Sequence, residues 1–498
     1  MKRSIVLRLL GGGLLAVGLF CLLAVSPRVA WADPGVLFAS PTGSGSACSQ
    51  DAPCQLQTAL SQAADGATIY LAQGTYTGSG AAVITLTKSI TLYGGWDGAA
   101  NGPVMRDPQA YSTTIDGEGM RRGVYISGGV APVLDGLIIT GGNATGFGGY
   151  GSSDAGGGIF VSGADPLIQG CLVISNTAGE NGTGGGLFFY SSSACIESCA
   201  VVSNTAPWGG GVRAIFGAPI FHASEFVSNT AGYGGGIYLM WTTAGTLLEA
   251  NTFRENKGSS GGAIYLSGAT ATIRRNLIRD NEGGRGGGVS VASGCAPVVL
   301  SANRIQGNIA ERGGGVHIYM NPARLDNNFI VENQVSEGGA GVFIEKAAPT
   351  FRHNTLARNS GGDGSGILVG IDSTAVLTNT ILVSHTVGIS VTVGSTATLE
   401  ATLWGSEAWA NDSDWAGGGT LTTGTVNLWG DPVFVDPDIK DYHIAPGSVA
   451  VDAGVDAGVN VDIDGDPRPA GAGYDLGADE LILPSIYLYL PLVLKGLP

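Results

Sequence analysis

The stretch GGAIYLSGATATIRRNLIRDN, residues 261–281, decides the fold, because the chain repeats its pattern on both sides. Each copy has a glycine cluster, a short apolar strand, a second short strand, and a polar residue followed five positions later by an asparagine. Between Gly156 and Ser384 the pattern returns every 25 to 28 residues. A fixed period of this length is typical of a stacked solenoid.

Two polar columns mark the repeat, and they stay five residues apart in every copy. The first column is Cys171, Cys199, Ser224, Asn251, Asn276, Asn303, Asn328, Asn354 and Asn379; the second is Asn176, Asn204, Asn229, Asn256, Asn281, Asn308, Asn333, Asn359 and Ser384. At a sharp bend between strands, backbone groups lack ladder partners. An inward asparagine tolerates the left-handed conformation and can bond the backbone of the next coil. We therefore predict internal amide ladders with a structural role.

Apolar residues alternate after each glycine cluster, as expected for strands with one buried face. The predicted inward pairs are Ile159/Val161, Leu187/Phe189, Ile237/Leu239, Ile264/Leu266, Val289/Val291, Val316/Ile318, Val342/Ile344 and Ile367/Val369. A second inward column runs from Ile168 to Val376, three residues before the first polar marker, and a third runs from Val173 to Ile381, between the markers. Three short strands per copy with no helix predict an all-β fold, a right-handed parallel β-helix with three sheets.

The regular array, residues 134–394, has different segments on each side. Residues 1–32 have a basic start, an apolar stretch and a small-x-small site, which predicts a secretory signal peptide with an uncleaved membrane anchor as the alternative. Residues 33–133 are predicted to form an N-terminal cap and the first irregular coils. Within them, Gln55 to Ala64 has apolar residues at helical spacing, and a helix there could cover the open end of the solenoid.

After the array, residues 395–481 are predicted to hold the terminal coils and a C-terminal module. Residues 482–498 form an apolar tail that contains three prolines and is too short and too broken to span a bilayer.

The composition limits the partners. The chain has 84 glycines and only 13% charged residues, with a net charge of −16. Removal of the four basic residues in the predicted signal peptide takes the charge to −20. An acidic surface of this size argues against nucleic acid or anionic lipid as a partner. We expect a secreted or cell-surface monomer.

Cysteines are few. Cys48 and Cys54 lie in one short polar loop, which in an exported protein predicts a local disulfide. Cys171 and Cys199 share a column in adjacent repeats and should stack about 4.8 Å apart as small buried residues. A disulfide between Cys171 and Cys199 is the alternative.

The motifs resemble those of a known class of proteins. Gly261-Gly262-Ala263-Ile264, taken with Phe253-Arg254-Glu255-Asn256, resembles the two short motifs of the polymorphic outer membrane protein repeat. The array as a whole is similar to bacterial exported right-handed β-helix repeat proteins, and residues 430–480 resemble a C-terminal module of unknown role that follows such arrays. The resemblance implies a fold and no single activity. The Asn-Thr-Asp, Gly-His-Gly and Arg-Ile-Lys signatures of pectin-degrading relatives do not occur in the sequence.

An outward column between the inward pairs is rich in aromatic residues. It reads Phe160, Phe188, Arg213, Tyr238, Tyr265, Ser290, His317, Phe343, Leu368 and Ser390. Exposed sheet faces normally carry polar residues. Tyr238, Tyr265, His317 and Phe343 are therefore predicted to bind an extracellular polysaccharide or a cell-surface component, with a self-stacking structural ladder as the alternative.

Catalytic candidates follow from position in these columns. A polysaccharide lyase needs a base and a cation beside the substrate carboxylate, for which the candidates are His317, Tyr319, Arg213 and Arg312. A glycoside hydrolase needs two carboxyl groups, for which the candidates are Glu311 with Glu337, or Glu345 with Glu337. The main hypothesis is a carbohydrate-binding, adhesive or structural module; a lyase or hydrolase acting on an extracellular polysaccharide is the alternative.

No metal cofactor is predicted, with calcium as one open alternative. Asp462, Asp464 and Asp466 alternate as at the start of a calcium loop, but the twelfth position is Gly473 instead of an acidic ligand. A turn held by Asp and Arg468 is the favoured interpretation.

Overall fold

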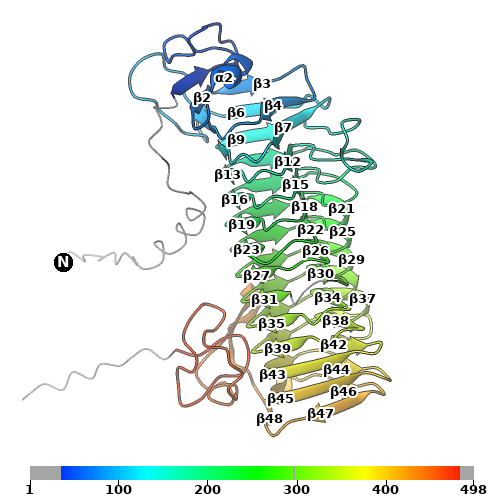
Figure 1. Ribbon diagram of the computed structural model, residues 1–498. Coiled ribbons are helices and arrows are strands. Elements are labelled where there is room, and N and C mark those ends of the chain that lie inside the picture. Colours follow the sequence, from blue (N-terminus) through cyan, green and yellow to red (C-terminus); the bar gives the residue numbers. More distant parts are fainter. Residues whose placement is uncertain (1–34, 295–297, 483–498) are drawn as a thin grey trace, which may run out of the picture.

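The fold is a right-handed parallel β-helix, as the repeat predicts (Figure 1). The structure is a computed structural model and describes residues 35–294 and 298–482. The predicted signal peptide, and the predicted tail from residue 483 onward, lie outside the described residues. No helix within the described ranges is long and apolar enough to cross a membrane.

Sheet B is built from the strand that follows each glycine cluster. Its thirteen parallel strands, in order, are β4 (Ala82–Leu86), β7 (Arg122–Ser127), β12 (Ile159–Ser162), β15 (Leu187–Tyr190), β18 (Val212–Ile215), β22 (Ile237–Met240), β26 (Ile264–Ser267), β30 (Val289–Val291), β34 (Val316–Tyr319), β38 (Val342–Glu345), β42 (Ser365–Gly370), β44 (Val387–Val391) and β46 (Ser413–Ala416).

Sheet A contains the second and third strands of each coil, which meet at the bend marked by the first polar column. Its 27 strands are β1 (Val36–Ala39), β2 (Thr68–Ala72), β3 (Gly74–Tyr76), β5 (Thr91–Trp96), β6 (Thr113–Asp116), β8 (Val133–Asp135), β9 (Leu137–Thr140), β13 (Leu167–Gln169), β14 (Leu172–Ile174), β16 (Cys195–Glu197), β17 (Ala200–Val202), β19 (Ile220–His222), β20 (Glu225–Val227), β23 (Leu247–Glu249), β24 (Thr252–Arg254), β27 (Thr272–Arg274), β28 (Leu277–Arg279), β31 (Val299–Ser301), β32 (Arg304–Gln306), β35 (Arg324–Asp326), β36 (Phe329–Val331), β39 (Thr350–Arg352), β40 (Thr355–Ala357), β43 (Thr374–Val383), β45 (Thr396–Gly405), β47 (Thr420–Thr423) and β48 (Asn427–Gly430).

Sheet C is a shorter strip that the sequence reasoning treated as loops. It lies between the second polar column and the next glycine cluster, and its six strands are β21 (Thr230–Tyr233), β25 (Lys257–Ser260), β29 (Glu282–Arg285), β33 (Ile309–Arg312), β37 (Gln334–Gly338) and β41 (Ser360–Gly361). The remaining elements are the hairpins β10 (Gly149–Tyr150)–β11 (Ser153–Asp154) and β49 (Phe434–Asp436)–β50 (Asp441–Ile444), the helix α2 (Leu56–Gln62), and the 3₁₀ turns η1 (Glu407–Trp409) and η2 (Pro437–Ile439).

The helix α2 lies at the N-terminal end of the solenoid beside β2 and buries Leu56 and Ala59 (Figure 1). That it serves as a cap stays a prediction. The structure has a disulfide between Cys48 and Cys54.

Asparagine ladders run through the bends, as the sequence predicts. Asn303 donates both its backbone N–H and one Nδ2 hydrogen to Oδ1 of Asn328, at 3.0 Å each, and Nδ2 also donates to the Ile273 carbonyl at 2.8 Å. The same pattern recurs from Asn251 to Asn354 and from Asn176 to Asn359. The ladder asparagines are all buried, so each amide replaces hydrogen bonds that the bend removes from the backbone.

Cys171 and Cys199 continue one ladder as free thiols, so the alternative of a disulfide between them is wrong. The backbone N–H of Cys171 lies 3.4 Å from the Cys199 sulfur, in the place where an asparagine oxygen accepts elsewhere. Burial raises the pKa of the Cys199 thiol.

The assignment of the last repeat is wrong by one residue. Phe351 pairs with Leu377 and Leu356 with Leu382, so the core columns continue through these leucines instead of Val376 and Ile381. The step from Asn354 to its successor is 26 residues, which leads to Thr380 and not to Asn379. Val376 is 39% exposed, and Asn379 instead donates to the Val455 carbonyl at 2.6 Å.

The second ladder contains one histidine in place of an asparagine and continues to Asn411. Asn359 Nδ2 lies 3.1 Å from Nε2 of His385, and the backbone N–H of His385 donates to Oδ1 of Asn411 at 2.9 Å. His385, and not Ser384, therefore occupies the asparagine position. Burial lowers its pKa to about 4.

Residues 430–480, to which we give the name C-terminal module, fold back against the β-helix (Figure 1). Its residues Phe434, Tyr442 and Ile463 join one apolar cluster with Phe329 and Val331 of β36. This second core attaches the module to the outer face of sheet A.

Replacement of Asn303 by Leu should lower the free energy of unfolding by about 1–3 kcal/mol, because backbone groups at two bends lose their partners. Chemical denaturation should show a lower midpoint for this variant. Asn101→Leu, at an exposed position, is the control and should unfold like the wild type. Equal midpoints for both variants would contradict an energetic role for the ladder.

Replacement of His385 by Asn should restore an asparagine at this step of the ladder and reduce acid sensitivity. The folded-state pKa of His385 is below the unfolded value of about 6.5, so its neutral form stabilises the fold fully above that pH, and this stability is lost as the pH falls toward about 4. Melting temperatures measured across this range should fall less steeply for His385→Asn than for the wild type. Identical slopes would contradict the assignment.

Candidate functional site

The outward residues of sheet B form one column in strict register, which we call the outer column. It comprises Thr85, Tyr125, Phe160, Phe188, Arg213, Tyr238, Tyr265, Ser290, His317, Phe343, Leu368 and Ser390. The structure thus brings together all four residues predicted to bind polysaccharide.

Most of the outer column is covered, so the expectation of an exposed aromatic face is wrong there. Tyr238 is 7% exposed and His317 and Phe343 are each 3% exposed; only Tyr265 is half-buried. The physical reason is sheet C, whose last residues reach over this face: Tyr233 contacts the Tyr265 ring at 5.2 Å, and the Arg312 guanidinium lies 5.9 Å from the Phe343 ring.

Rings in the outer column stack on one another. Ring centroids are 5.0 Å apart for Tyr125 and Phe160, 5.6 Å for Phe160 and Phe188, and 5.4 Å for His317 and Phe343. Such contacts contribute about 0.5–1.5 kcal/mol per pair. The buried part of the column therefore has the geometry of the self-stacking ladder.

Arg213 interrupts the ladder and is held by rings instead of carboxylates. Its guanidinium lies 4.8 Å from the Tyr238 ring, 5.5 Å from Tyr150 and 5.6 Å from Trp208. Burial lowers its pKa. Since it is only 6% exposed, it is poorly placed to neutralise a substrate carboxylate.

His317 lies between two polar partners. Its Nδ1 is 3.5 Å from Ser290 Oγ, and its Nε2 is 3.4 Å from Glu345. Burial lowers the pKa of His317 although Glu345 raises it, and the hydrogen bond with His317 lowers the pKa of Glu345. A neutral imidazole could act as a base, but a polymer would have to displace covering residues to reach it. Tyr319 is half-buried two residues further along the same strand.

Of the remaining acidic and basic candidates, Glu311, Arg312 and Glu337 lie in sheet C and Glu345 lies in β38 of sheet B. Arg312 forms an ion pair with Glu337, and Glu345 is engaged with His317. Glu311 instead lines a shallow groove of about 700 Å³ over sheet C, with Lys257 and Glu282. The candidate hydrolase carboxylates are thus placed in separate interactions. Arg285 is exposed and makes no ion pair within residues 35–294 and 298–482.

Sequence reasoning missed an exposed group of rings at the corner where sheet B ends. Tyr190 contacts Phe216 at 5.9 Å, and Phe216 stacks on Trp241 at 5.5 Å with an interplanar angle of 21°. Phe216 is 37% exposed and Trp241 44% exposed. We call these three residues the corner platform. The sequence signal was available: large aromatic residues stand two positions after the last inward residue of two adjacent strands.

The corner platform lies at a bend whose backbone is left-handed in several coils. Phe216 and Trp241 have φ values of +60° and +51°. Bulky residues rarely adopt this left-handed region, which costs of the order of 1 kcal/mol or more. In the next coil Gly268 leaves room for the indole, since a Cβ there would lie 2.3 Å from Trp241 Cδ1.

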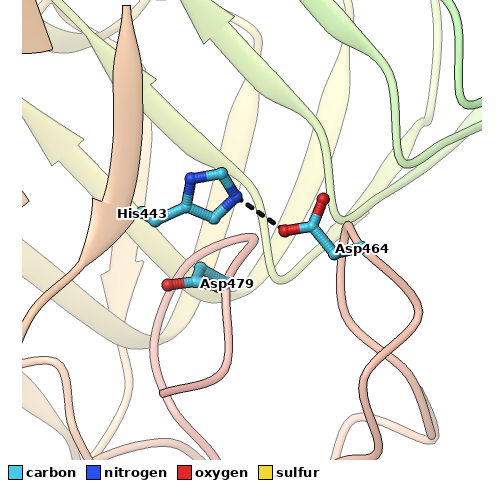
Figure 2. A group of neighbouring side chains, drawn as sticks. All are labelled: His443, Asp464 and Asp479. Atoms are coloured by element: carbon cyan, nitrogen blue, oxygen red, sulfur yellow. Dashed lines mark hydrogen bonds and ion pairs between the residues drawn. The ribbon is translucent and has the colours of Figure 1, made fainter. Parts of the chain in front are cut away.

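A second polar cluster joins the C-terminal module to the β-helix (Figure 2). His443, Asp464 and Asp479 bring ligand-type atoms within 4.8 Å of one another, a spacing that could suit a cation. However, His443 Nε2 is bonded to Asp464 at 2.7 Å, its Nδ1 contacts Asp441, and the Arg304 guanidinium lies 3.2 Å from Asp464. Asp464 and Asp441 thus already pair with protein cations, and Asp479 accepts the backbone N–H of Ile444 at 2.8 Å, so the arrangement is that of an ion-pair network.

The aspartates considered for calcium include Asp464 of this network. Asp462 uses one oxygen to accept backbone N–H groups of Asp464, Gly465 and Asp466 at 2.8–2.9 Å, and the other to accept that of Glu480. Arg468 and Glu480 form a fully buried ion pair nearby. This geometry is that of the Asp-held turn.

Among the comparisons with known proteins, a family model agrees with the fold. A family model described as right handed beta helix region matches residues 110–253 and 157–335. The chain is similar to the crystal structure of pectate lyase Pel9A, with 13% identity and a TM-score of 0.36, over 90% of this chain and 96% of that one. It is also similar to the family 28 exopolygalacturonase of Yersinia enterocolitica, with 11% identity and a TM-score of 0.25, over 80% of this chain and 78% of that one. No curated protein matches the chain. Likeness at this level carries no argument about activity.

The ion-pair network should make the module joint sensitive to alkali. Burial alone would lower the pKa of His443, but its bonds to Asp464 and Asp441 outweigh burial and raise the pKa to about 9. Its contribution to stability is therefore complete below about pH 6.5 and is lost as the pH rises through about 9. Thermal unfolding should show this alkaline loss in the wild type and a smaller loss in His443→Gln. A wild-type curve that is flat across this range would contradict the assignment.

Proposed function

We propose that the protein is an extracellular or cell-surface carbohydrate-binding β-helix that holds a polysaccharide along its axis through the corner platform. The exposed stacked pair of Phe216 and Trp241 carries the proposal. Successive coils lie about 4.8 Å apart, so rings from neighbouring coils form a continuous apolar strip. Pyranose rings have apolar C–H faces that suit such a strip.

The left-handed backbone recurs at this corner in other coils, at Ser191, Met320, Lys346 and Ile371, so it belongs to the bend and not to the corner platform. What distinguishes Phe216 and Trp241 is that they place large rings at this bend and leave them more than one-third exposed. Exposed apolar groups of this kind favour a binding role over packing.

Charge and redox chemistry favour the proposed ligand and setting. The net charge of −16 disfavours polyanions at long range, and no side chain of the corner platform is charged, so we propose a neutral polysaccharide for this site. The Cys48–Cys54 disulfide is typical of an oxidising compartment outside the cytosol.

The double variant Phe216→Asn with Trp241→Asn tests the proposal. Asparagine tolerates the left-handed backbone, so the free energy of unfolding should change by less than about 1 kcal/mol. Wild-type protein should be retained on at least one neutral polysaccharide in a glycan array or affinity gel, and the variant should lose that retention.

Met320→Asn is the matched control, since Met320 is half-exposed at the same corner position three coils further on, with φ +50°. It should bind like the wild type. Loss of folding in the double variant would show that the rings serve packing, and unchanged binding would place any glycan site elsewhere.

The enzyme alternative has one observation in its favour, the neutral His317 between Ser290 and Glu345. Its burial argues against direct attack on a polymer. A depolymerisation screen that follows the ultraviolet absorbance of unsaturated products separates the two functions. New absorbance that His317→Gln abolishes would replace the binding proposal by a lyase.

A further inference from the structure

The stacked rings of the outer column stop one strand before sheet B does. Tyr125 stacks on Phe160 on one side, with an interplanar angle of 12°. On its other side the register places Thr85 of β4, the terminal strand of the sheet. Threonine has no ring, so the next position of the stack is vacant.

A cavity occupies that vacant position. It measures about 840 Å³ and is lined by Tyr125, Thr85, Phe147 and Arg122, with the hydroxyl groups of Thr77 and Ser79. Pockets of this size with aromatic walls and a few polar groups are typical small-molecule sites. Phe147 is 38% exposed, so the aromatic wall is open to an entering ring.

The covering seen elsewhere in the column does not extend to Tyr125. The hairpin β10–β11 lies over the next rings, since Tyr150 contacts Phe188 at 5.9 Å and the Gly149 Cα faces Phe160 and Arg122. Tyr125 and Thr85 remain as lining of the open cavity.

Arg122 gives the cavity a fixed positive charge. Its side chain lies between two rings, 5.1 Å from Phe160 and 5.5 Å from Phe147. Nε donates to the Ala155 carbonyl at 2.8 Å and Nη2 to that of Gly148 at 2.5 Å, while Nη1 has no hydrogen-bond partner within the described residues. Arg122 also makes no ion pair there, although it is only 3% exposed.

Asp154 is the carboxylate whose charge acts on Arg122, but its oxygens already accept other hydrogen bonds. The charge of Asp154 raises the pKa of Arg122 against the lowering by burial, but both Asp154 oxygens accept backbone N–H groups, from Gly146 and Gly148. A buried cation without an ion-pair partner favours an anion within contact distance. The negative charge of the whole chain acts over longer distances, where salt screens it beyond about 10 Å.

We propose that this cavity binds the ring of an acidic sugar, with the ring face stacked on Tyr125 and the acidic group toward Nη1 of Arg122. The ligand ring takes the vacant position of the stack. The site is separate from the corner platform and does not depend on the function proposed there.

Filling the cavity from within tests the proposal. Thr85→Phe should add the missing ring and exclude the ligand, without loss of stability, because cross-strand ring pairs stabilise a sheet. Ser390→Phe is the matched control, because it adds a ring at the opposite end of the same column. Saturation-transfer-difference NMR with glucuronate, galacturonate, N-acetylneuraminate, glucose and benzoate reports contact with the ring protons.

Saturation transfer to at least one of the three acidic sugars is expected with wild-type protein and with Ser390→Phe, and at least a tenfold weaker affinity with Thr85→Phe. Tyr125→Leu, which keeps apolar cover on Phe160, should weaken binding similarly. The double variant Phe216→Asn with Trp241→Asn should bind as the wild type does, which separates this site from the corner platform.

Three results would overturn the proposal. The first is no difference between wild type and Thr85→Phe for any acidic sugar. The second is equal affinity for glucose, which removes the role of Arg122. The third is binding of benzoate alone, which makes the site one for aromatic acids.

Discussion

The hydrogen bond from one asparagine amide to the next is the constraint on which the rest of this structure depends. Each coil contributes two strands to sheet A and must bend sharply between them. The bend exposes backbone groups to an apolar interior. The amide of Asn303 satisfies such groups in its own coil and in the next one, so the coils stack only when equivalent residues align. Alignment at the bends then fixes the register of all three sheets, because a shift of one residue would turn every side chain to the other face.

Register of this strictness has consequences outside the core. It places like residues on top of one another along the outer column, so that rings stack on rings and Ser290, His317 and Glu345 come within hydrogen-bond range. Sheet C then covers this face, because Tyr233 and Arg312 at the ends of its strands reach across it. A column that points away from the core is therefore largely buried, and outward direction alone does not make a surface.

The fold could be predicted from the sequence because the same pattern occurs in many copies. The inward pairs and the amide ladders follow from alternation and from the polar columns, and the structure confirms them from Ile159 to Val369. The errors come where a single copy has to be interpreted alone. A step of 26 residues after Asn354 places Leu377 in the core column and Asn379 outside the ladder, and no local feature marks that change. The site was harder to predict, because burial of the outer column depends on sheet C, whose strands carry glycine, charge and aromatic residues with no alternation.

Stacking also indicates where binding is physically available on a solenoid. A ring inside a ladder has neighbours on both faces and therefore has no free face on which a ligand could stack. A ring at the end of a ladder, or at a corner that the neighbouring sheet does not cover, keeps one face or edge free. Tyr125 is of the first kind, with Thr85 where the next ring would be, and Phe216 with Trp241 is of the second. Both positions depend on small neighbours, Thr85 in one case and Gly268 in the other. The positions where the repeat omits a large side chain are therefore as informative about function as those where it supplies one.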